Sequence, residues 1–223
     1  MIIRGMNETN IWDYENAFYW YSSPTRLNKL LAHFELYKSI SDLPGHILEF
    51  GVFKGVSLIR LATFRSTLEN DFARKIVGFD AFGKFPKKGL KLKIDQDFSI
   101  HHDKSAGNGL DIKTLKNILN KKGFKNIELI KGNIIKTLPK YLDDNPETRI
   151  AFLHLDMDVK EPTDLALNLL FDRVVPGGLI ILDDYNAVAG ETISVDEFVK
   201  KNKLKIEKLP YYYLPAFIRK PFK

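Results

Sequence analysis

The 223-residue sequence contains no cysteine, and this absence excludes several kinds of site at once. A chain without thiols forms no disulfide framework, zinc ribbon or iron–sulfur cluster and has no cysteine nucleophile. No apolar stretch approaches the roughly 20 residues that a membrane-spanning helix needs. Residues 1–18, MIIRGMNETNIWDYENAF, carry charged side chains where a secretion signal would have its apolar run. We therefore expect a cytoplasmic protein with no membrane partner.

What the chain does contain is enough apolar side chain for one sizeable core. Hydrophobic residues make up 44% of the sequence and aromatic residues 12%. These fractions and this length fit a single α/β domain with accessory segments, because two full domains would be cramped. We expect an N-terminal helical extension over residues 1–44 and one α/β domain over residues 45–223.

The formal net charge is +6, and lysines gather in residues 84–93, 120–126 and 200–208. Apolar residues are interleaved with most of these lysines, as on the solvated faces of helices and strands. This pattern favours an ordinary surface over a nucleic-acid footprint, so we expect no nucleic-acid partner. A phosphorylated small substrate would exploit the same positive field.

From residue 45 onward, short apolar runs alternate with segments that have apolar residues at helical spacing. Continuous apolar runs are typical of strands covered on both faces, as in a parallel sheet flanked by helices. Strands are predicted at residues 45–51, 74–80, 126–132, 149–156 and 176–184. Helices are predicted at residues 23–40, 56–70, 110–123, 162–174 and 193–202. The order predicts a doubly wound, Rossmann-like α/β fold.

Three parts of the chain depart from this alternation. Two short strands at residues 203–210 and 216–221 are predicted to form an antiparallel pair at the sheet edge. Residues 84–109 show little regular signal, and a stretch of this length suggests either a lid or binding loop, or a disordered surface segment. The aromatic stretch IWDYENAFYWY supplies either a dimer surface, and so a homo-oligomer, or a patch that packs on the domain.

In a doubly wound sheet, ligands bind beyond the carboxyl ends of the strands. The first predicted strand ends in EFGVFKGVS, which contains Glu49, Gly51, Gly55 and Ser57. Gly51 allows a sharp turn and close approach of a ligand, while Gly55 leaves the following helix N-terminus open. Phe53 stands where a dinucleotide-binding fingerprint would have its second glycine, which argues against that fingerprint. Two glycines after a strand also fit an ordinary turn.

The next two strand ends indicate a nucleoside. Asp80 ends the second predicted strand and can accept hydrogen bonds from both hydroxyls of a ribose. Gly132 and Asn133 follow the third strand, and the Asn133 amide can both donate to and accept from an adenine. The sequence therefore predicts a cofactor that contains a nucleoside.

Carboxylates follow the fourth and fifth predicted strands. Asp156 and Asp158 flank Met157, and Asp183 and Asp184 are adjacent. If the two strands are neighbours, the carboxylates converge, and their repulsion raises some pKa values or requires a cation. Oxygen ligands without thiols favour magnesium, manganese or calcium over zinc. Single aspartates also cap helices, but two such motifs on adjacent strands favour a metal.

Together these motifs resemble the class I S-adenosylmethionine-dependent methyltransferases, and within them the macrocin O-methyltransferase (TylF-like) family. The matching segments occur in the family's order and are PGHILEFGVFKGVSLIRLA, GFDAFGKFP, KGNIIKTLP, LHLDMDVKEPTDLAL and PGGLIILDDYNAVAGETISVDEF. The resemblance implies a seven-stranded, mostly parallel sheet with helices on both faces and an antiparallel last strand. It also implies that residues 45–223 are the methyltransferase domain.

The resemblance assigns roles to individual residues. The positions that match its S-adenosylmethionine site are Glu49, Gly51, Gly55, Ser57 and Asp80, beside which we place Asn133. Asp156, Asp183 and Asp184 match its magnesium ligands. By this resemblance, a metal held there would bind the acceptor hydroxyl, lower its pKa and orient its oxygen toward the methyl group. The implied reaction is divalent-metal-dependent methylation of a sugar hydroxyl, on a nucleotide-linked sugar, a glycan or a secondary metabolite.

The base in this reaction has several candidates. In related catechol-type methyltransferases a lysine shortly after the first metal-binding aspartate acts as base. Lys160 is therefore a candidate if its pKa is depressed, or else a surface lysine at a helix start. Asp156 is the competing candidate. His154 is expected to point into the packing of the sheet, whereas His101 and His102 lie where a lid would contact substrate.

Two other functions stay open at this point. The DMD motif is a D-x-D pattern that can hold a metal and a sugar nucleotide in a glycosyltransferase. That interpretation leaves the glycine turn and the Asp183–Asp184 pair unexplained. The fold can also serve as a non-catalytic binding module that uses the N-terminal helix and the basic face.

Overall fold

The computed structural model describes residues 2–222, and its main element is a seven-stranded sheet in the order β5-β4-β3-β6-β7-β9-β8. The strands are β3 (His46–Phe50), β4 (Ile76–Asp80), β5 (Ile127–Lys131), β6 (Ile150–Leu155), β7 (Val174–Leu182), β8 (Glu207–Lys208) and β9 (Ala216–Arg219). Strands β3 to β7 run parallel, and β9 is antiparallel to both of its neighbours. The predicted seven-stranded, mostly parallel sheet with an antiparallel last strand is confirmed.

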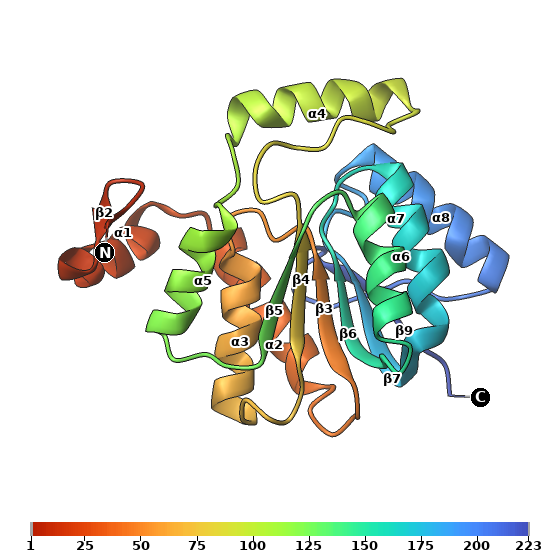
Figure 1. The fold of residues 1–223 in the computed structure, drawn as a ribbon, viewed down its shortest axis with the longest axis horizontal. Helices are drawn as coiled ribbons and strands as arrows, with labels where there is room; N and C mark the ends of the chain where they lie inside the picture. The colour runs from red at the N-terminus through yellow and green to blue at the C-terminus, as the bar shows by residue number, and fades with distance from the viewer. Residues whose placement is uncertain (1, 223) are drawn as a thin grey trace.

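Helices cover both faces of the sheet and give the molecule three layers (Figure 1). One face carries α2 (Pro24–Lys38), α3 (Val56–Leu68) and α5 (Ile112–Lys121), and the other carries α6 (Ile134–Asp144), α7 (Lys160–Leu170) and α8 (Ala189–Asn202). Strand side chains alternate between two cores, so Phe152 packs with the first set and Leu153 with the second. Within residues 2–222, no helix combines the length and apolarity that crossing a bilayer requires.

The strand order reverses between β3 and β6, and this reversal positions the site. The chain moves outward from β3 to β4 and β5 and then places β6 on the other side of β3. Backbone hydrogen bonds continue past the strand ends, from Asp156 N to Phe50 O at 2.9 Å and from Asp183 N to Leu155 O at 3.0 Å. The fourth and fifth predicted strands are therefore neighbours, as the metal-site prediction requires.

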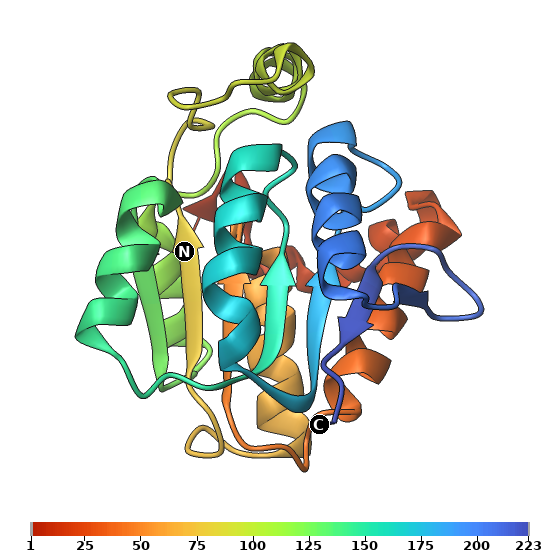
Figure 2. The same ribbon diagram turned by 90° about the vertical axis from the view of Figure 1, so that its right-hand side faces the viewer.

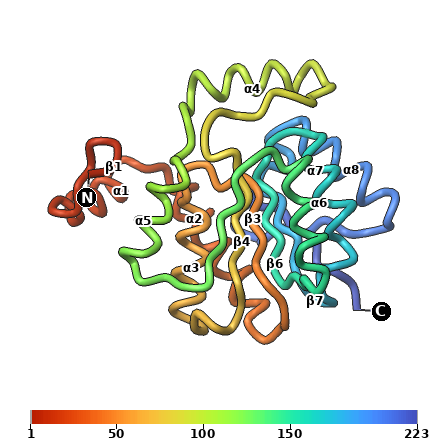
Figure 3. The backbone as a smooth tube through the Cα atoms, viewed as in Figure 1, coloured from red at the N-terminus to blue at the C-terminus, as the bar shows by residue number. Residues whose placement is uncertain are grey.

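Residues 84–109 are more regular than predicted, because they contain α4 (Lys93–Ser105). The chain rises from β4, passes toward α7 and α8, and returns through α4 across the carboxyl ends of the strands (Figures 2 and 3). The buried residues of α4 are Asp95 and Ser99. A helix that buries polar side chains lacks the apolar periodicity by which helices are predicted. We refer to residues 83–107 as the covering segment.

The N-terminal part divides into an outlying portion and a packed helix. Strands β1 (Ile2–Ile3) and β2 (Met6–Asn7), a 3₁₀ turn (Glu8–Asn10) and α1 (Ile11–Tyr21) stand beside α5 (Figure 1). No residue of α1 is fully buried, although Tyr14 and Phe18 are half-buried, so the dimer surface and the packing on the domain both stay predictions. Helix α2, in contrast, packs into the core. The division at residue 44 also stays a prediction.

Two further helices, α1 and α6, went unpredicted. Pro139 lies inside α6, and an interior proline normally interrupts a helical pattern. The helix nonetheless buries Leu138, Tyr141 and Leu142 against the sheet.

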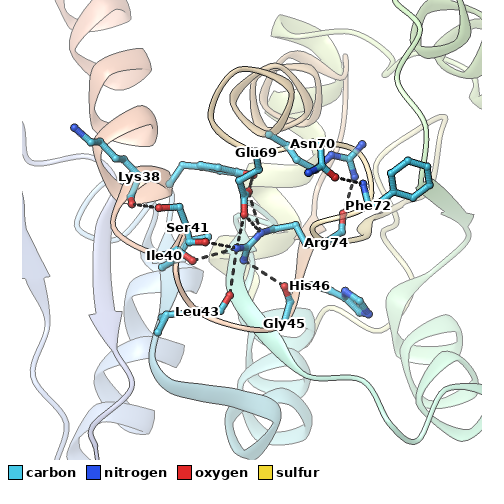
Figure 4. Close-up of polar contacts among 12 residues, drawn as sticks. Lys38, Ile40, Ser41, Leu43, Gly45, His46, Glu69, Asn70, Phe72 and Arg74 are labelled. Atoms are coloured by element: carbon cyan, nitrogen blue, oxygen red, sulfur yellow. Dashed lines mark hydrogen bonds and ion pairs between the residues drawn. The ribbon is translucent and has the colours of Figure 1, made fainter.

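The end of the sheet opposite the site is held by Arg74, whose side chain is almost completely buried (Figure 4). Its guanidinium donates to the Glu69 carboxylate at 2.6 Å. It also donates to the carbonyls of Ile40, Leu43 and Gly45 at 3.2–3.3 Å. These charge-assisted bonds join the end of α3 to the connection between α2 and β3.

Candidate active site

A cavity opens at the carboxyl ends of β3, β4, β6 and β7, beneath the covering segment. The predicted site residues that line it are Gly51, Asp80, Asn133, Asp156, Asp183 and Asp184. Those that do not line it are Glu49, Gly55, Ser57 and Lys160. The structure therefore brings the predicted nucleoside-binding residues and the predicted metal ligands into one space.

Gly51 is required by the close approach of two backbones at the base of this cavity. Its φ is +92°, and a Cβ at this position would lie 1.7 Å from the carbonyl oxygen of Asp156. Only glycine fits such an approach without displacing β6. The turn after β3 is therefore shaped by its neighbouring strand as well as by any ligand.

Three predicted cofactor-binding residues lie behind the cavity wall. Gly55 precedes α3 with φ +79°, and a Cβ there would lie 2.7 Å from the side chain of Leu115. Glu49 is fully buried and accepts a hydrogen bond from the Ser57 hydroxyl. These residues fix the turn after β3, and their direct contact with a cofactor stays a prediction.

Asp80 joins the end of β4 to the glycine turn. Its carboxylate accepts hydrogen bonds from the backbone N–H of Phe53 at 2.9 Å and from that of Phe82. Burial raises the pKa of Asp80, and the backbone N–H groups oppose this rise only in part. Each carboxylate oxygen has two lone pairs, so acceptor capacity is left for a ligand in the cavity.

Asn133 has a structural task in addition to lining the cavity. Its side-chain oxygen accepts a hydrogen bond from Ile135 N at 3.0 Å and so caps α6. The cap orients the side chain at the end of β5, where an adenine was predicted to lie.

The four carboxylates at the ends of β6 and β7, Asp156, Asp158, Asp183 and Asp184, form what we call the acidic cluster. Oxygens of Asp156, Asp183 and Asp184 all lie within 4.8 Å of one another. Burial and the neighbouring carboxylates raise the pKa of Asp156 and that of Asp158 well above the usual range. A hard divalent cation would relieve this repulsion, and oxygen ligands alone suit magnesium.

Asp183 differs from the other members of the acidic cluster because its surroundings favour the ionised form. Burial opposes its ionisation, but contacts with His154 and His33 and the charge of Lys29 hold the pKa of Asp183 well below its usual range. His154 Nε2 lies 3.2 Å from Asp183 Oδ1, and the Lys29 ammonium pairs with the other carboxylate oxygen. Asp183 thus supplies a fixed negative charge in the cavity wall.

The buried histidines differ in protonation. His154 lies between Asp183 and Glu49; burial lowers its pKa, but hydrogen bonding to the two carboxylates outweighs burial and raises the pKa to about 9. His33 Nε2 lies 3.4 Å from Asp183 Oδ1, and burial lowers its pKa to about 4. His154 is buried in the sheet as predicted, but within a polar network.

His33, His154 and Asp183 form a second group whose ligand atoms lie within 4.8 Å of one another. All three are fully enclosed, and neither histidine lines the cavity. An ion entering from solvent therefore reaches the aspartate trio first. Of the two other histidines considered, His102 lines the cavity and His101 does not.

Residues that the sequence analysis missed complete the site. Lys29 and His33 lie one turn apart on α2, a spacing that places them on one helix face. Glu191, at the start of α8, is fully buried, and its carboxylate accepts a hydrogen bond from Asp184 N at 3.2 Å. Its own N–H donates to Asp158 O. The spacing on α2 was visible in the sequence, but nothing there linked this face to β7.

The structure does not support Lys160 as the base. Its ammonium pairs with Asp164 and Glu197 outside the cavity. Burial lowers the pKa of Lys160, but these two carboxylates outweigh burial, so the pKa is raised. A general base needs reach to the substrate and a pKa near the working pH, and Lys160 has neither.

The sheet order, the glycine turn and the cavity at the strand ends define the α/β fold of the S-adenosylmethionine-dependent methyltransferases. Two solved structures share it. The calicheamicin methyltransferase CalS11 has a TM-score of 0.76 at 24% identity, covering 96% of this chain and 86% of that protein. The O-methyltransferase NovP has a TM-score of 0.75 at 20% identity, covering 86% and 79%. At these identities the similarity shows the fold.

The model of the macrocin O-methyltransferase (TylF) family matches residues 19–211, and the chain belongs to this family. A Streptomyces olivaceus relative, 8-demethyl-8-(2,3-dimethoxy-alpha-L-rhamnosyl)-tetracenomycin-C 4'-O-methyltransferase, is 31% identical over 149 residues, which cover 64% of this chain and 54% of the relative. The apo structure of CalS11, described as a TDP-rhamnose 3'-O-methyltransferase, is 25% identical with a TM-score of 0.67, covering 96% and 87%. The chain thus spans little more than half the length of the curated relatives it matches.

Proposed function

We propose that the chain transfers the methyl group of S-adenosylmethionine to a sugar hydroxyl and that the transfer depends on a divalent metal. Membership of the TylF family supports methyl transfer over the glycosyltransferase and binding-module alternatives. The observation that carries the proposal is the single cavity in which Gly51 and Asp80 lie together with the acidic cluster.

The cofactor would lie over the ends of β3 and β4. Gly51 leaves room beside the backbone, Asp80 offers acceptors to the ribose hydroxyls, and Asn133 borders the adenine. The covering segment lies over this space and would keep water from the reactive methyl group.

Magnesium, or another hard divalent cation, would be held by Asp156, Asp183 and Asp184. The fit rests on their oxygen donors, which lie within 4.8 Å of one another, and on the raised pKa values of Asp156 and Asp184. Such a cation, when bound, supplies Lewis acidity that lowers the pKa of an acceptor hydroxyl.

Methyl transfer itself needs an oxygen nucleophile and a proton acceptor. The hydroxyl oxygen forms a bond to the methyl carbon, the carbon–sulfur bond breaks, and the electron pair leaves with S-adenosylhomocysteine. The hydroxyl proton must pass to a base. Asp156 and Asp158 line the cavity, so either carboxylate is placed to accept it.

A rhamnose-type sugar is the first acceptor to assay. The Streptomyces olivaceus relative is named for a rhamnosyl substrate and CalS11 for TDP-rhamnose. We propose a sugar of the same kind here, nucleotide-linked or attached to a secondary metabolite.

Isothermal titration with S-adenosylhomocysteine tests the cofactor. We expect one molecule to bind per chain, and we expect Asp80→Asn to weaken binding about tenfold because the ribose loses a charged acceptor. Asp172→Asn is a matched control, since the Asp172 side chain is 99% exposed. Absence of binding to the folded protein would overturn the proposed function.

A further inference from the structure

The covering segment places two unpartnered lysines in the cavity wall. Of the five lysines in residues 84–93, two pair with carboxylates of α4. Lys84 and Lys88 have no hydrogen-bond or ion-pair partner within residues 2–222, and both line the cavity. The side chain of Lys91, although in the same stretch, does not line it.

Two polar bonds attach the covering segment to the body of the domain close to these lysines. Asp95, only 1% exposed, accepts a hydrogen bond from Lys160 N at the start of α7 at 2.9 Å. The Glu161 carboxylate accepts another from Lys91 N at 2.8 Å. Both bonds attach the covering segment, at Lys91 and Asp95, to the start of α7.

Two ammonium groups in the cavity wall without partners among the described residues suit an anionic ligand. The acidic cluster has its own cation in Lys29, which pairs with Asp183. A neutral sugar would present no negative charge to Lys84 or Lys88. A phosphate ester would, because lysine binds phosphate oxygens through charge-assisted hydrogen bonds.

An open groove continues from this part of the cavity. Lys84 and Phe85 line both spaces, and the groove adds Lys87, Asp103 and Asn108. The Phe85 ring offers a face on which a base can stack, and Asn108 offers a polar edge, whereas Asp103 is paired with Lys87. The groove thus has the chemistry for a nucleoside beyond the phosphates.

We propose that the acceptor sugar carries a phosphate ester, as in a nucleoside diphosphate sugar, and that Lys84 and Lys88 bind its phosphates. The nucleoside lies in the groove beside Phe85, and the sugar extends toward the acidic cluster. This inference rests on the proposed function, because it assumes that the sugar hydroxyl is methylated in the same cavity.

Titration of the protein saturated with S-adenosylhomocysteine, in magnesium buffer, tests the inference without requiring the right sugar. The probes are dTDP, UDP, GDP and inorganic pyrophosphate. We expect at least one nucleoside diphosphate to bind with a Kd below about 1 mM. Lys84→Met and Lys88→Met should each raise this Kd about five- to tenfold, and Lys91→Met, the matched control, should leave it within about twofold.

The outcomes separate this inference from the proposed function. Binding of S-adenosylhomocysteine but of no diphosphate overturns the inference and leaves methyl transfer standing. The inference is also overturned if all three lysine variants bind the diphosphate with the wild-type Kd, because the metal site then holds the phosphates. If pyrophosphate binds as tightly as every nucleotide, phosphate binding by the two lysines is supported, but the placement of a nucleoside in the groove is overturned. Absence of S-adenosylhomocysteine binding overturns both proposals.

Discussion

The acidic cluster and the covering segment border the same cavity but are built in different ways. The cluster follows β6 and β7, and backbone hydrogen bonds from Asp156 N and Asp183 N continue the strand pairing. The buried His154 contacts the Asp183 carboxylate. The covering segment rests on polar bonds such as that from Lys160 N to Asp95, and α4 buries just two residues.

This difference separates two tasks. Chemistry that depends on carboxylates at fixed spacing lies on the sheet, where backbone ladders hold positions firmly. In the proposed function, acceptor recognition falls to the covering segment, which can be altered without disturbing the sheet. Substitutions in the cluster should therefore stop turnover, and substitutions in the segment should change acceptor binding.

The largest effect is expected from Asp184→Asn. Losing one charged metal ligand should lower kcat about 1000-fold, equivalent to about 4 kcal/mol, while affinity for S-adenosylhomocysteine stays within about twofold. Transfer of radiolabelled methyl groups measures kcat. Lys160→Met is the control and should retain activity within about threefold, because its ammonium lies outside the cavity. Wild-type activity of Asp184→Asn in the presence of a chelator would disprove the metal's role.

A pair of glycine substitutions compares the two regions for rigidity. Gly51→Ala should lower the free energy of unfolding by about 3 kcal/mol or more, since its Cβ would meet the Asp156 carbonyl at 1.7 Å. Gly89→Ala in the covering segment also has a positive φ, +103°, but meets nothing within 4 Å, so about 1 kcal/mol of strain is expected. Urea unfolding measures both variants, and equal losses in the free energy of unfolding would show that the two regions do not differ in rigidity.

The buried network beneath the cluster should make the metal-free protein less stable as pH rises. The pKa of His154 is raised from 6.5 to about 9, so its stabilisation is complete below pH 6.5 and is lost as pH passes through about 9. The difference, 9 minus 6.5, corresponds to stability on the order of 3 kcal/mol. The raised pKa values of Asp156 and Asp158 act in the same direction.

Urea unfolding in EDTA between pH 6.5 and 9 measures this dependence. His154→Gln should flatten the profile, because glutamine keeps a polar side chain but does not titrate. A wild-type stability that stays constant or rises over this range would contradict the assigned pKa of His154.

A smaller effect is expected at the attachment of the covering segment. Asp95→Ala removes the acceptor for Lys160 N and should cost about 1–2 kcal/mol locally. We expect faster protease cleavage within residues 83–107 and a KM for the acceptor raised about tenfold, with cofactor binding unchanged. Asp97→Ala is the control, because Asp97 is exposed and pairs with Lys93 on the same helix. Identical cleavage rates in the two variants would show that Asp95 does not hold the segment.

The acidic cluster could be predicted from the sequence because the two strands that carry it could be predicted. The apolar runs at residues 149–156 and 176–184 place Asp156 and Asp183 at the same edge of any parallel sheet, whatever the side-chain details. The glycine turn was predictable for the same reason. The 1.7 Å approach at Gly51 was not, because it depends on the register of β3 against β6.

Contacts between distant helices and the acidic cluster could not be predicted from the sequence. Lys29 lies on α2 and Glu191 on α8, and only tertiary packing brings them to Asp183 and Asp184. Lys160 is a further case. It was a candidate base because a lysine follows the first metal-binding aspartate in related catechol-type methyltransferases, but the first turn of α7 directs its ammonium away from the cavity.

A crystal structure of the chain with S-adenosylhomocysteine and Mn²⁺, with data collected at the manganese absorption edge, would locate the metal and the cofactor together. We predict one anomalous peak about 2 Å from oxygens of Asp156, Asp183 and Asp184, and the cofactor ribose on Asp80. Manganese bound elsewhere, or a cofactor outside the cavity at the ends of β3 and β4, would contradict this prediction.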